Sequence, residues 1–183
     1  MTQTIIVADD HPLFRAALKQ AVNQAVPDVE TVEVDSIKSL QAAVESHPDA
    51  DLILLDLNMP GAHGFSGLVF MRGQYPGLPV VVVSGSEELQ VMRRSIDYGA
   101  SGFIPKSAPL PTITEAMRAV LGGDVWHREG VADKLERMHA DTTDFSEKSA
   151  RDAHTRSAIT SAIFTNPQKR RFIYFEKNNV AGL

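Results

Sequence analysis

The chain contains no cysteine, and it contains no apolar run of the length that crosses a membrane. The first absence excludes disulfides, thiolate nucleophiles and cysteine-ligated zinc, and it is typical of proteins from a reducing compartment. The second excludes a membrane-spanning helix, which needs roughly 18 consecutive apolar residues. The first residues, Met1–Thr4, also lack the positive charge of a signal peptide. We therefore expect a cytoplasmic protein that does not associate with membranes.

Positive charge is scarce in the first two thirds of the chain. Residues 1–128 carry 9 Lys and Arg against 15 Asp and Glu, whereas residues 129–183 carry 9 against 8. Because nucleic acids attract basic surfaces, the acidic part is not expected to bind them by bulk charge. A concentration of carboxylates is better suited to a cation.

Short apolar runs alternate with segments of helical periodicity, five times over in about 120 residues. The runs, read as buried strands, are residues 4–8, 31–34, 52–55, 80–83 and 102–104. The helical segments are residues 12–26, a helix capped by Asp35 or Ser36 and ended by His47, a weak glycine-rich helix around residues 65–71, and residues 87–98 and 110–121. This order predicts an α/β fold: a flavodoxin-like, doubly wound (βα)5 parallel sheet with strand order 2-1-3-4-5.

Polar residues stand at the ends of four of these strands. Asp9 and Asp10 follow the first strand, Asp56 the third, Ser84 the fourth and Lys106 the fifth. Parallel sheets place their chemistry at the carboxyl ends of strands, and strands one and three are neighbours in the predicted order. Three carboxylates should therefore converge and repel one another, which a hard divalent cation such as Mg²⁺ relieves.

The remaining two groups suit a phosphoryl oxygen. The hydroxyl of Ser84 and the ammonium of Lys106 supply a hydrogen-bond donor and a positive charge. Together with a carboxylate nucleophile and a metal ion, they predict a site that forms and holds an aspartyl phosphate on Asp56.

At residues 3–125 the chain resembles a response-regulator receiver domain. The segments that carry the resemblance are Val7–Pro12, Leu55–Gly61, Ser84–Gly85 and Gly99–Ser107. The first and last of them are similar to the NarL/FixJ (LuxR-type) subfamily. These motifs, in order and at the family's spacing, make the resemblance specific.

The resemblance implies a role for each residue of the site. Asp56 would accept phosphate from a sensor histidine kinase or a phosphotransfer protein. Mg²⁺ would bind to Asp10 and Asp56 through their side chains, to Asn58 through its backbone carbonyl and to Asp9 through water. Ser84 and Lys106 would bind the phosphoryl group.

The resemblance also implies a conformational switch in which Ser84 and Phe103 move together, and a cis Ile104–Pro105 bond. For Phe103, an ordinary place in the core is an equally good interpretation. His11 is read as a polar residue at a helix start rather than a metal ligand, and His63 as a solvated residue.

The region after the predicted receiver departs from the subfamily. We expect a receiver domain at residues 1–124 and an atypical, mostly helical or partly disordered extension at residues 125–183, because the usual helix-turn-helix signature is absent. DNA binding is therefore in doubt, although transcriptional regulation is the usual output. A stand-alone receiver, acting as a phosphorelay intermediate or a phosphate sink, is the alternative. The family offers two faces for a homodimer, helix 1 with helix 5, or helix 4 with strand 5 and helix 5.

A haloacid-dehalogenase-type phosphohydrolase is a remote alternative. Such enzymes also place a nucleophilic aspartate after a buried strand, with Mg²⁺ and a lysine. They need a second aspartate two positions later as a general acid, and this chain has Asn58 there. The sequence therefore favours a signalling switch over an enzyme.

Overall fold

The computed structural model describes residues 2–126 of the 183-residue chain. The predicted extension at residues 125–183 lies almost entirely outside the described residues. The strands are β1 (Thr4–Ala8), β2 (Glu30–Val34), β3 (Leu52–Asp56), β4 (Val80–Ser84) and β5 (Gly102–Pro105). The helices are α1 (Pro12–Ala25), α2 (Ile37–Ser46), α3 (Ser66–Gln74), α4 (Leu89–Asp97) and α5 (Leu110–Leu121).

The five strands form one parallel sheet in the order β2-β1-β3-β4-β5, as the sequence predicts. Strands β1, β3 and β4 are buried along their whole length. Continuous apolar strands of this kind are expected where helices cover both faces of a parallel sheet. The predicted flavodoxin-like fold class is thus confirmed for the described part of the chain.

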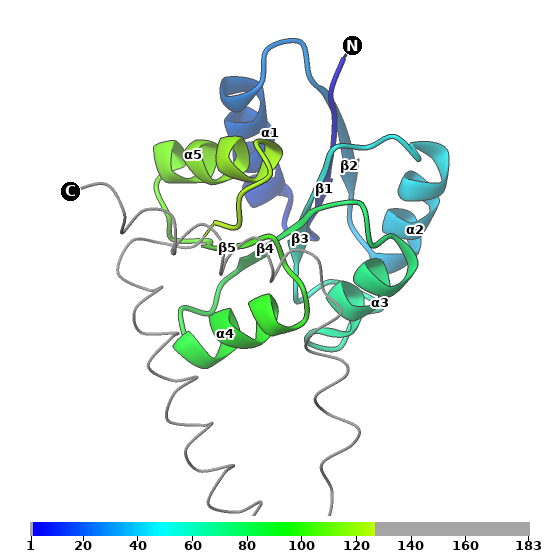
Figure 1. The fold of residues 1–183 in the computed structure, drawn as a ribbon, viewed down its shortest axis with the longest axis vertical. Coiled ribbons are helices and arrows are strands. Elements are labelled where there is room, and N and C mark those ends of the chain that lie inside the picture. The colour runs from blue at the N-terminus through cyan, green and yellow to red at the C-terminus, as the bar shows by residue number, and fades with distance from the viewer. Residues whose placement is uncertain (1, 127–183) are drawn as a thin grey trace, which may run out of the picture. The chain divides into compact units, whose positions relative to one another are not determined.

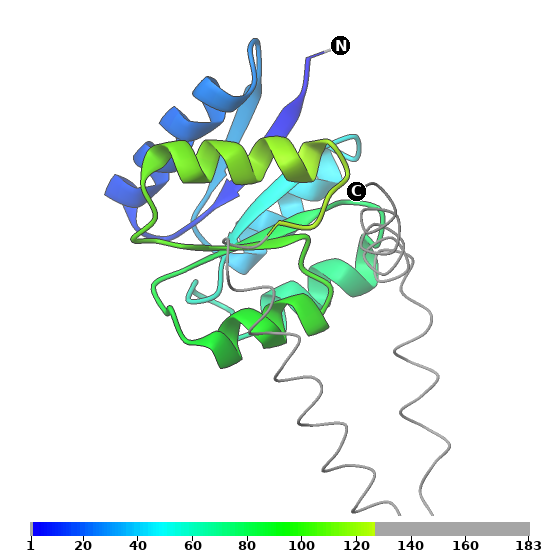
Figure 2. The same cartoon turned by 60° about the vertical axis from the view of Figure 1, so that its left-hand side comes forward.

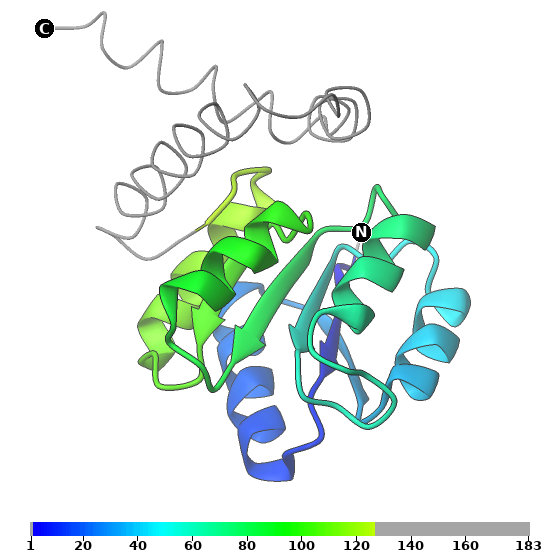
Figure 3. The same cartoon turned by 90° about the horizontal axis from the view of Figure 1, so that it is seen from below.

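The helices form two layers. Helices α1 and α5 pack against each other on one face of the sheet, and α2, α3 and α4 cover the other face (Figures 1 and 2). Figure 3 looks onto the side of α3 and α4, which lie in front of the strands. A hydrophobic core cluster lies between the sheet and the α1–α5 layer, and Leu18, Leu54, Ile104 and Met117 are among its fully buried members. No helix in this part of the chain is long and apolar enough to cross a membrane.

The exact ends of several helices and strands depend on local interactions that the sequence predicts only in part. Ser36, rather than Asp35, is the N-cap of α2, and it forms a reciprocal capping box with Ser39. Helix α4 begins at Leu89 instead of residue 87, because Glu88 is extended and its N–H donates to the hydroxyl of Ser86. Strand β5 extends one residue further than predicted, through Pro105.

The prediction of a cis Ile104–Pro105 bond is wrong. No peptide bond among residues 2–126 is cis. Pro105 continues β5 opposite Ser84 in the parallel register, and the Lys106 N–H then donates to the Ser84 carbonyl at 2.7 Å. An extended strand that continues in register needs the trans bond, which is also the usual state of the peptide before proline.

Candidate functional site

The adjacency of β1 and β3 brings the predicted carboxylates to one edge of the sheet. Ala8 pairs with Leu55, so that the residues that follow each strand partner, Asp9 and Asp56, emerge side by side. Asp9 is 0% exposed and Asp56 is 2% exposed, whereas Asp10 is only partly buried. Two of the three carboxylates are therefore held almost without solvent.

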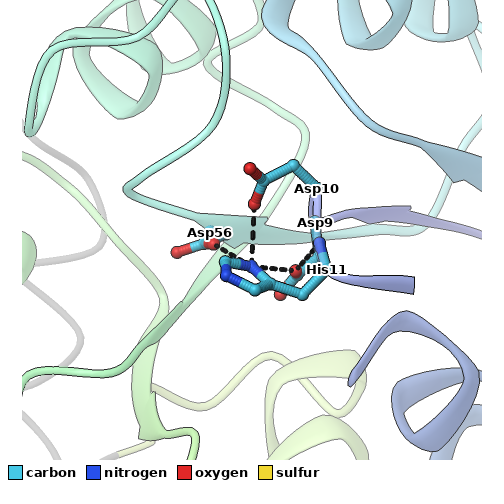
Figure 4. A group of neighbouring side chains, drawn as sticks. All are labelled: Asp9, Asp10, His11 and Asp56. Atoms are coloured by element: carbon cyan, nitrogen blue, oxygen red, sulfur yellow. Dashed lines mark hydrogen bonds and ion pairs between the residues drawn. The ribbon is translucent and has the colours of Figure 1, made fainter. Parts of the chain in front are cut away.

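These carboxylates lie within reach of a single ion. One oxygen from each of Asp9, Asp10 and Asp56, and one ring nitrogen of His11, lie within 4.8 Å of one another (Figure 4). Carboxylate oxygens are the ligands that Mg²⁺ prefers, and a partly open site lets the ion keep several of its waters. The donor set therefore fits a hard divalent cation, as the sequence predicts.

Lys106 is the main counter-charge of this acidic cluster. Its Nζ lies 2.7 Å from Oδ2 of Asp9 and 2.7 Å from Oδ2 of Asp56, and 4.9 Å from the centre of the Phe14 ring. Burial of the ammonium lowers the pKa of Lys106, but the hydrogen bonds and charges of Asp56 and Asp9 outweigh it, so that the pKa is raised. Lys106 is thus held charged between the two buried carboxylates.

Ser84 reaches the same edge from β4. Val83 pairs with Asp56, so Ser84 lies one residue further toward the carboxyl edge of the sheet than the phosphoacceptor candidate Asp56. Ser84 is 1% exposed. Its Oγ accepts a hydrogen bond from the Ser86 N–H at 3.2 Å. The structure thereby brings together residues from the ends of four strands, namely Asp9, Asp10, Asp56, Ser84 and Lys106.

The positions of Asn58 and Phe103 are consistent with the roles predicted for them, but the positions alone do not test those roles. The N–H of Asn58 donates to Oδ1 of Asp56 at 3.1 Å, which fixes the start of the loop after β3. Phe103 is 3% exposed within β5. Its role as a switch, like the role of the Asn58 carbonyl as a ligand, stays a prediction. His63 is exposed, as expected.

Two residues of the site were not assigned to it from the sequence. His11 is the N-cap residue of α1, as expected, but its ring does not cap the helix. Instead Nδ1 lies 3.2 Å from Asp9, 2.8 Å from Asp10 and 3.8 Å from Asp56 (Figure 4). Its place directly after the two aspartates was the available signal.

Arg15 is the second such residue. Its Nη1 donates to the backbone carbonyl of Asp9 at 2.6 Å, and its Nε lies 3.4 Å from a carboxylate oxygen of Glu33 on β2. Arg15 therefore ties the loop that carries Asp9 and Asp10 to a neighbouring strand. The only sequence signal was a single basic residue in the first turns of the helix that follows the two aspartates.

Comparison with known proteins agrees with this geometry. The profile of the response regulator receiver domain matches residues 5–118. The chain is 45% identical over 122 residues to a glycerol metabolism activator from Pseudomonas putida, a match that covers 67% of this chain and 55% of that protein. It is 32% identical to the nitrate/nitrite response regulator protein NarL of Escherichia coli strain K12, over 67% of this chain and 56% of the relative. The matched region thus spans little more than half the length of these relatives.

Solved structures give the same result. The signal receiver domain of the response regulator NarL from Mycobacterium tuberculosis aligns with a TM-score of 0.60 at 28% identity, over 67% of this chain and 98% of that one. A LuxR family DNA-binding response regulator from Silicibacter pomeroyi aligns with a TM-score of 0.61 at 29% identity, over 69% of this chain and 98% of that one. With the profile matching more than half of its residues, the chain belongs to the response regulator receiver domain family.

Proposed function

We propose that this two-component response regulator accepts a phosphoryl group on Asp56 from the phosphohistidine of a sensor histidine kinase or a phosphotransfer protein. One observation carries the proposal. The Asp56 carboxylate, 2% exposed, lies 2.7 Å from the ammonium of Lys106 and within 4.8 Å of two further carboxylates. A nucleophile, a fixed cation and a site for a second cation are the parts that phosphoryl transfer to a carboxylate requires.

The transfer exchanges one bond to phosphorus for another. An oxygen of Asp56 attacks the phosphorus atom, the P–O bond forms, and the P–N bond to the donor imidazole breaks, leaving the imidazole to take up a proton. Lys106 stabilises the negative charge on the phosphoryl oxygens, and the Ser84 hydroxyl donates to one of them. Asp10, Asp56 and the Asn58 carbonyl would hold Mg²⁺, with Asp9 acting through water. The ion would neutralise charge that builds up between the carboxylates and the phosphoryl group.

The acidic cluster also has a defined resting state, in which Asp56 carries no phosphoryl group. Lys106 already bridges Asp9 and Asp56 before any phosphoryl group is present. Because an acyl phosphate on Asp56 replaces one negative oxygen by a larger anionic group, Lys106 and Ser84 have to follow the new oxygens. That movement, relayed to Phe103 on β5, is the proposed switch.

The output is assigned from the relatives. Residues 1–124 form the proposed receiver and residues 125–183 the proposed extension. The relatives include proteins named as activators and as response regulators, and one of the similar solved structures is named as a DNA-binding response regulator. We assign transcriptional regulation on this basis, with a stand-alone relay or phosphate sink as the alternative. A homodimer would use the α1–α5 face or the α4–β5–α5 face.

The proposal is tested by phosphorylation with acetyl phosphate and Mg²⁺, followed by intact mass spectrometry. The wild-type chain should gain one phosphoryl group, and Asp56→Asn should gain none. Asp49→Asn is the matched control, because Asp49 is an exposed aspartate on the turn before β3 and should leave the reaction unchanged. Modification of Asp56→Asn at the wild-type rate would reject the assignment. Sustained release of phosphate from small phosphomonoesters would indicate a hydrolase instead of a switch.

A further inference from the structure

The outer edge of β5 is the place where the described chain returns to its own sheet. Strand β5 is the last in the order β2-β1-β3-β4-β5, so within residues 2–126 no further strand pairs with its outer side. An open edge of this kind presents unpaired N–H and C=O groups to any extended segment. After α5 the chain turns back and runs beside β5 up to residue 126 (Figure 2).

Trp126 pairs with this edge through its backbone. It forms a parallel bridge with Gly102, its N–H donates to the Ser101 carbonyl at 2.9 Å, and its carbonyl accepts from the Phe103 N–H at 3.3 Å. These are the bonds that a sixth strand would make. The N–H of Phe103, the proposed switch residue, therefore bonds to Trp126, which lies outside the five strands of the sheet.

The sequence is adapted to this return on both sides of the contact. Gly123 has φ +94°, a conformation that other residues rarely adopt, and the Asp124 N–H then closes the turn on the Ala119 carbonyl. A Cβ atom on Gly102 would lie 3.0 Å from the Trp126 carbonyl oxygen, which is tighter than most real contacts of this kind, so the Trp126 backbone would have to move by a few tenths of an ångström. The close approach of the two backbones thus favours glycine at position 102.

The side chain of Trp126 adds apolar contact to these bonds. It is half-buried and packs against the core cluster between the sheet and the α1–α5 layer. A tryptophan that is partly removed from water contributes a large apolar area to whatever it anchors. The contact of Trp126 with β5 therefore combines backbone hydrogen bonds with apolar packing.

The same strand leads directly to the acidic cluster. Beyond Phe103, Pro105 pairs with Ser84, and Lys106 donates its N–H to the Ser84 carbonyl before its ammonium reaches Asp56. A displacement of β5 near Gly102 should also displace Lys106, because only three residues of continuous strand separate the two. A packed core shifts in steps rather than deforming gradually, so the strand should move as a unit.

We propose that the outer edge of β5 is a docking surface for residues 124–126, and that this docking couples the phosphorylation site to the chain that follows α5. The inference rests on the proposed function and adds its output route. Docking holds β5 in register and so keeps Lys106 at the edge of the sheet where its ammonium can follow the oxygens of a phosphoryl group on Asp56. Occupancy of the site therefore strengthens docking, and by thermodynamic linkage docking strengthens occupancy by the same factor.

The test uses the full chain with beryllofluoride and Mg²⁺, where beryllofluoride takes the place of a phosphoryl group on Asp56. Trp126 is the only tryptophan in the sequence, so tryptophan fluorescence comes from this position alone. Adding beryllofluoride to the wild type should reduce quenching of Trp126 by acrylamide and should slow hydrogen exchange at the Phe103 amide. Gly102→Ala should speed that exchange by about tenfold and should weaken beryllofluoride binding.

Gly77→Ala is the matched control, because a Cβ at exposed Gly77 meets nothing within 4 Å. It should behave as the wild type in all three measurements. If Gly102→Ala does not fold, as judged by far-UV circular dichroism, Trp126→Ala removes the indole anchor and should give the same faster exchange and weaker binding.

Binding of beryllofluoride itself is followed by ¹⁹F NMR, which separates the two proposals. Absence of binding to the wild type would reject the proposed function. If beryllofluoride binds the wild type while Trp126 and the Phe103 amide do not respond, the coupling is overturned and the phosphorylation site stands. Equal beryllofluoride affinity in the wild type and in an undocked variant would overturn it as well.

Discussion

The ammonium of Lys106 lies 2.7 Å from a carboxylate oxygen of Asp56, although 50 positions separate the two residues in the chain. The contact spans from the end of β5 to the end of β3, across β4. It also includes Asp9, whose side chain is fully buried and whose Oδ2 lies at the same distance from the ammonium. Two buried carboxylates without a counter-charge would be costly, so this lysine supports both the fold and the site.

Replacing Lys106 by methionine should lower stability in a way that a divalent cation repairs. The substitution keeps the bulk of the side chain but leaves Asp9 and Asp56 without their cation, and breaking a buried ion pair costs about 3 kcal/mol. We expect that loss in urea unfolding with EDTA, and a larger gain on adding Mg²⁺ than in the wild type. Lys38→Met, at an exposed position on α2, is the control and should change neither quantity. An equal response of both variants to Mg²⁺ would show that the cation does not replace the charge of Lys106.

The pH dependence of the same pair follows from the raised pKa of Lys106. Burial lowers that pKa, but the hydrogen bonds and charges of Asp56 and Asp9 outweigh the burial. A pKa that is higher in the folded state gives stability that is fully present below the unfolded value, near 10.5, and is lost as pH rises through the folded value. The difference in unfolding free energy between the wild type and Lys106→Met should therefore stay constant from neutral pH to about pH 10 and shrink above it. A difference that already falls near neutral pH would show that the ammonium is not held in this way.

Strand ends could be predicted from the sequence because buried parallel strands leave an unmistakable apolar run before each polar residue. Once the order 2-1-3-4-5 is expected, the meeting of Asp9 with Asp56 follows from the adjacency of β1 and β3. The contact between Arg15 and the Asp9 carbonyl has no such pattern, because any helix can carry an arginine in its first turns. The Ile104–Pro105 bond was predicted wrongly because a family expectation was applied where Pro105 itself continues the strand.

Arg15 should act on metal binding without touching the metal. It donates to the Asp9 carbonyl at 2.6 Å and is itself held by Glu33, so it fixes the loop that presents Asp9 and Asp10. Arg15→Met should weaken Mg²⁺ binding by about tenfold, the usual effect of losing a group that orients ligands. Isothermal titration calorimetry measures the affinity, and urea unfolding in EDTA shows whether the fold is intact.

Lys19→Met provides the matched control for Arg15. Lys19 pairs with the same Glu33 carboxylate at 2.7 Å, whereas Arg15 also donates to the Asp9 carbonyl. Losing this half-exposed ion pair should leave Mg²⁺ affinity unchanged. If both variants weaken Mg²⁺ binding alike, the effect belongs to the charge at Glu33 and the positioning role of Arg15 is wrong.

Leu13 should contribute to recognition of the protein that donates the phosphoryl group. It stands in the first turn of α1, two residues after His11 at the acidic cluster, and it is 91% exposed. A fully exposed leucine gains nothing in the isolated chain, whereas a donor protein that reaches Asp56 would cover it and gain from removing it from water. Leu13→Ser should therefore slow transfer from a phosphorylated histidine kinase by about tenfold, which corresponds to roughly 1.4 kcal/mol.

Acetyl phosphate separates recognition from chemistry at this position. The small donor needs no protein surface, so Leu13→Ser should accept phosphate from it at the wild-type rate. Val69→Ser is the control on α3, where Val69 is 48% exposed, and it should leave both reactions unchanged. Slower phosphorylation of Leu13→Ser by acetyl phosphate would place the effect in the acidic cluster instead. Acetyl phosphate is too small to touch the first turn of α1, so only a group that shapes the reacting site can alter transfer from it.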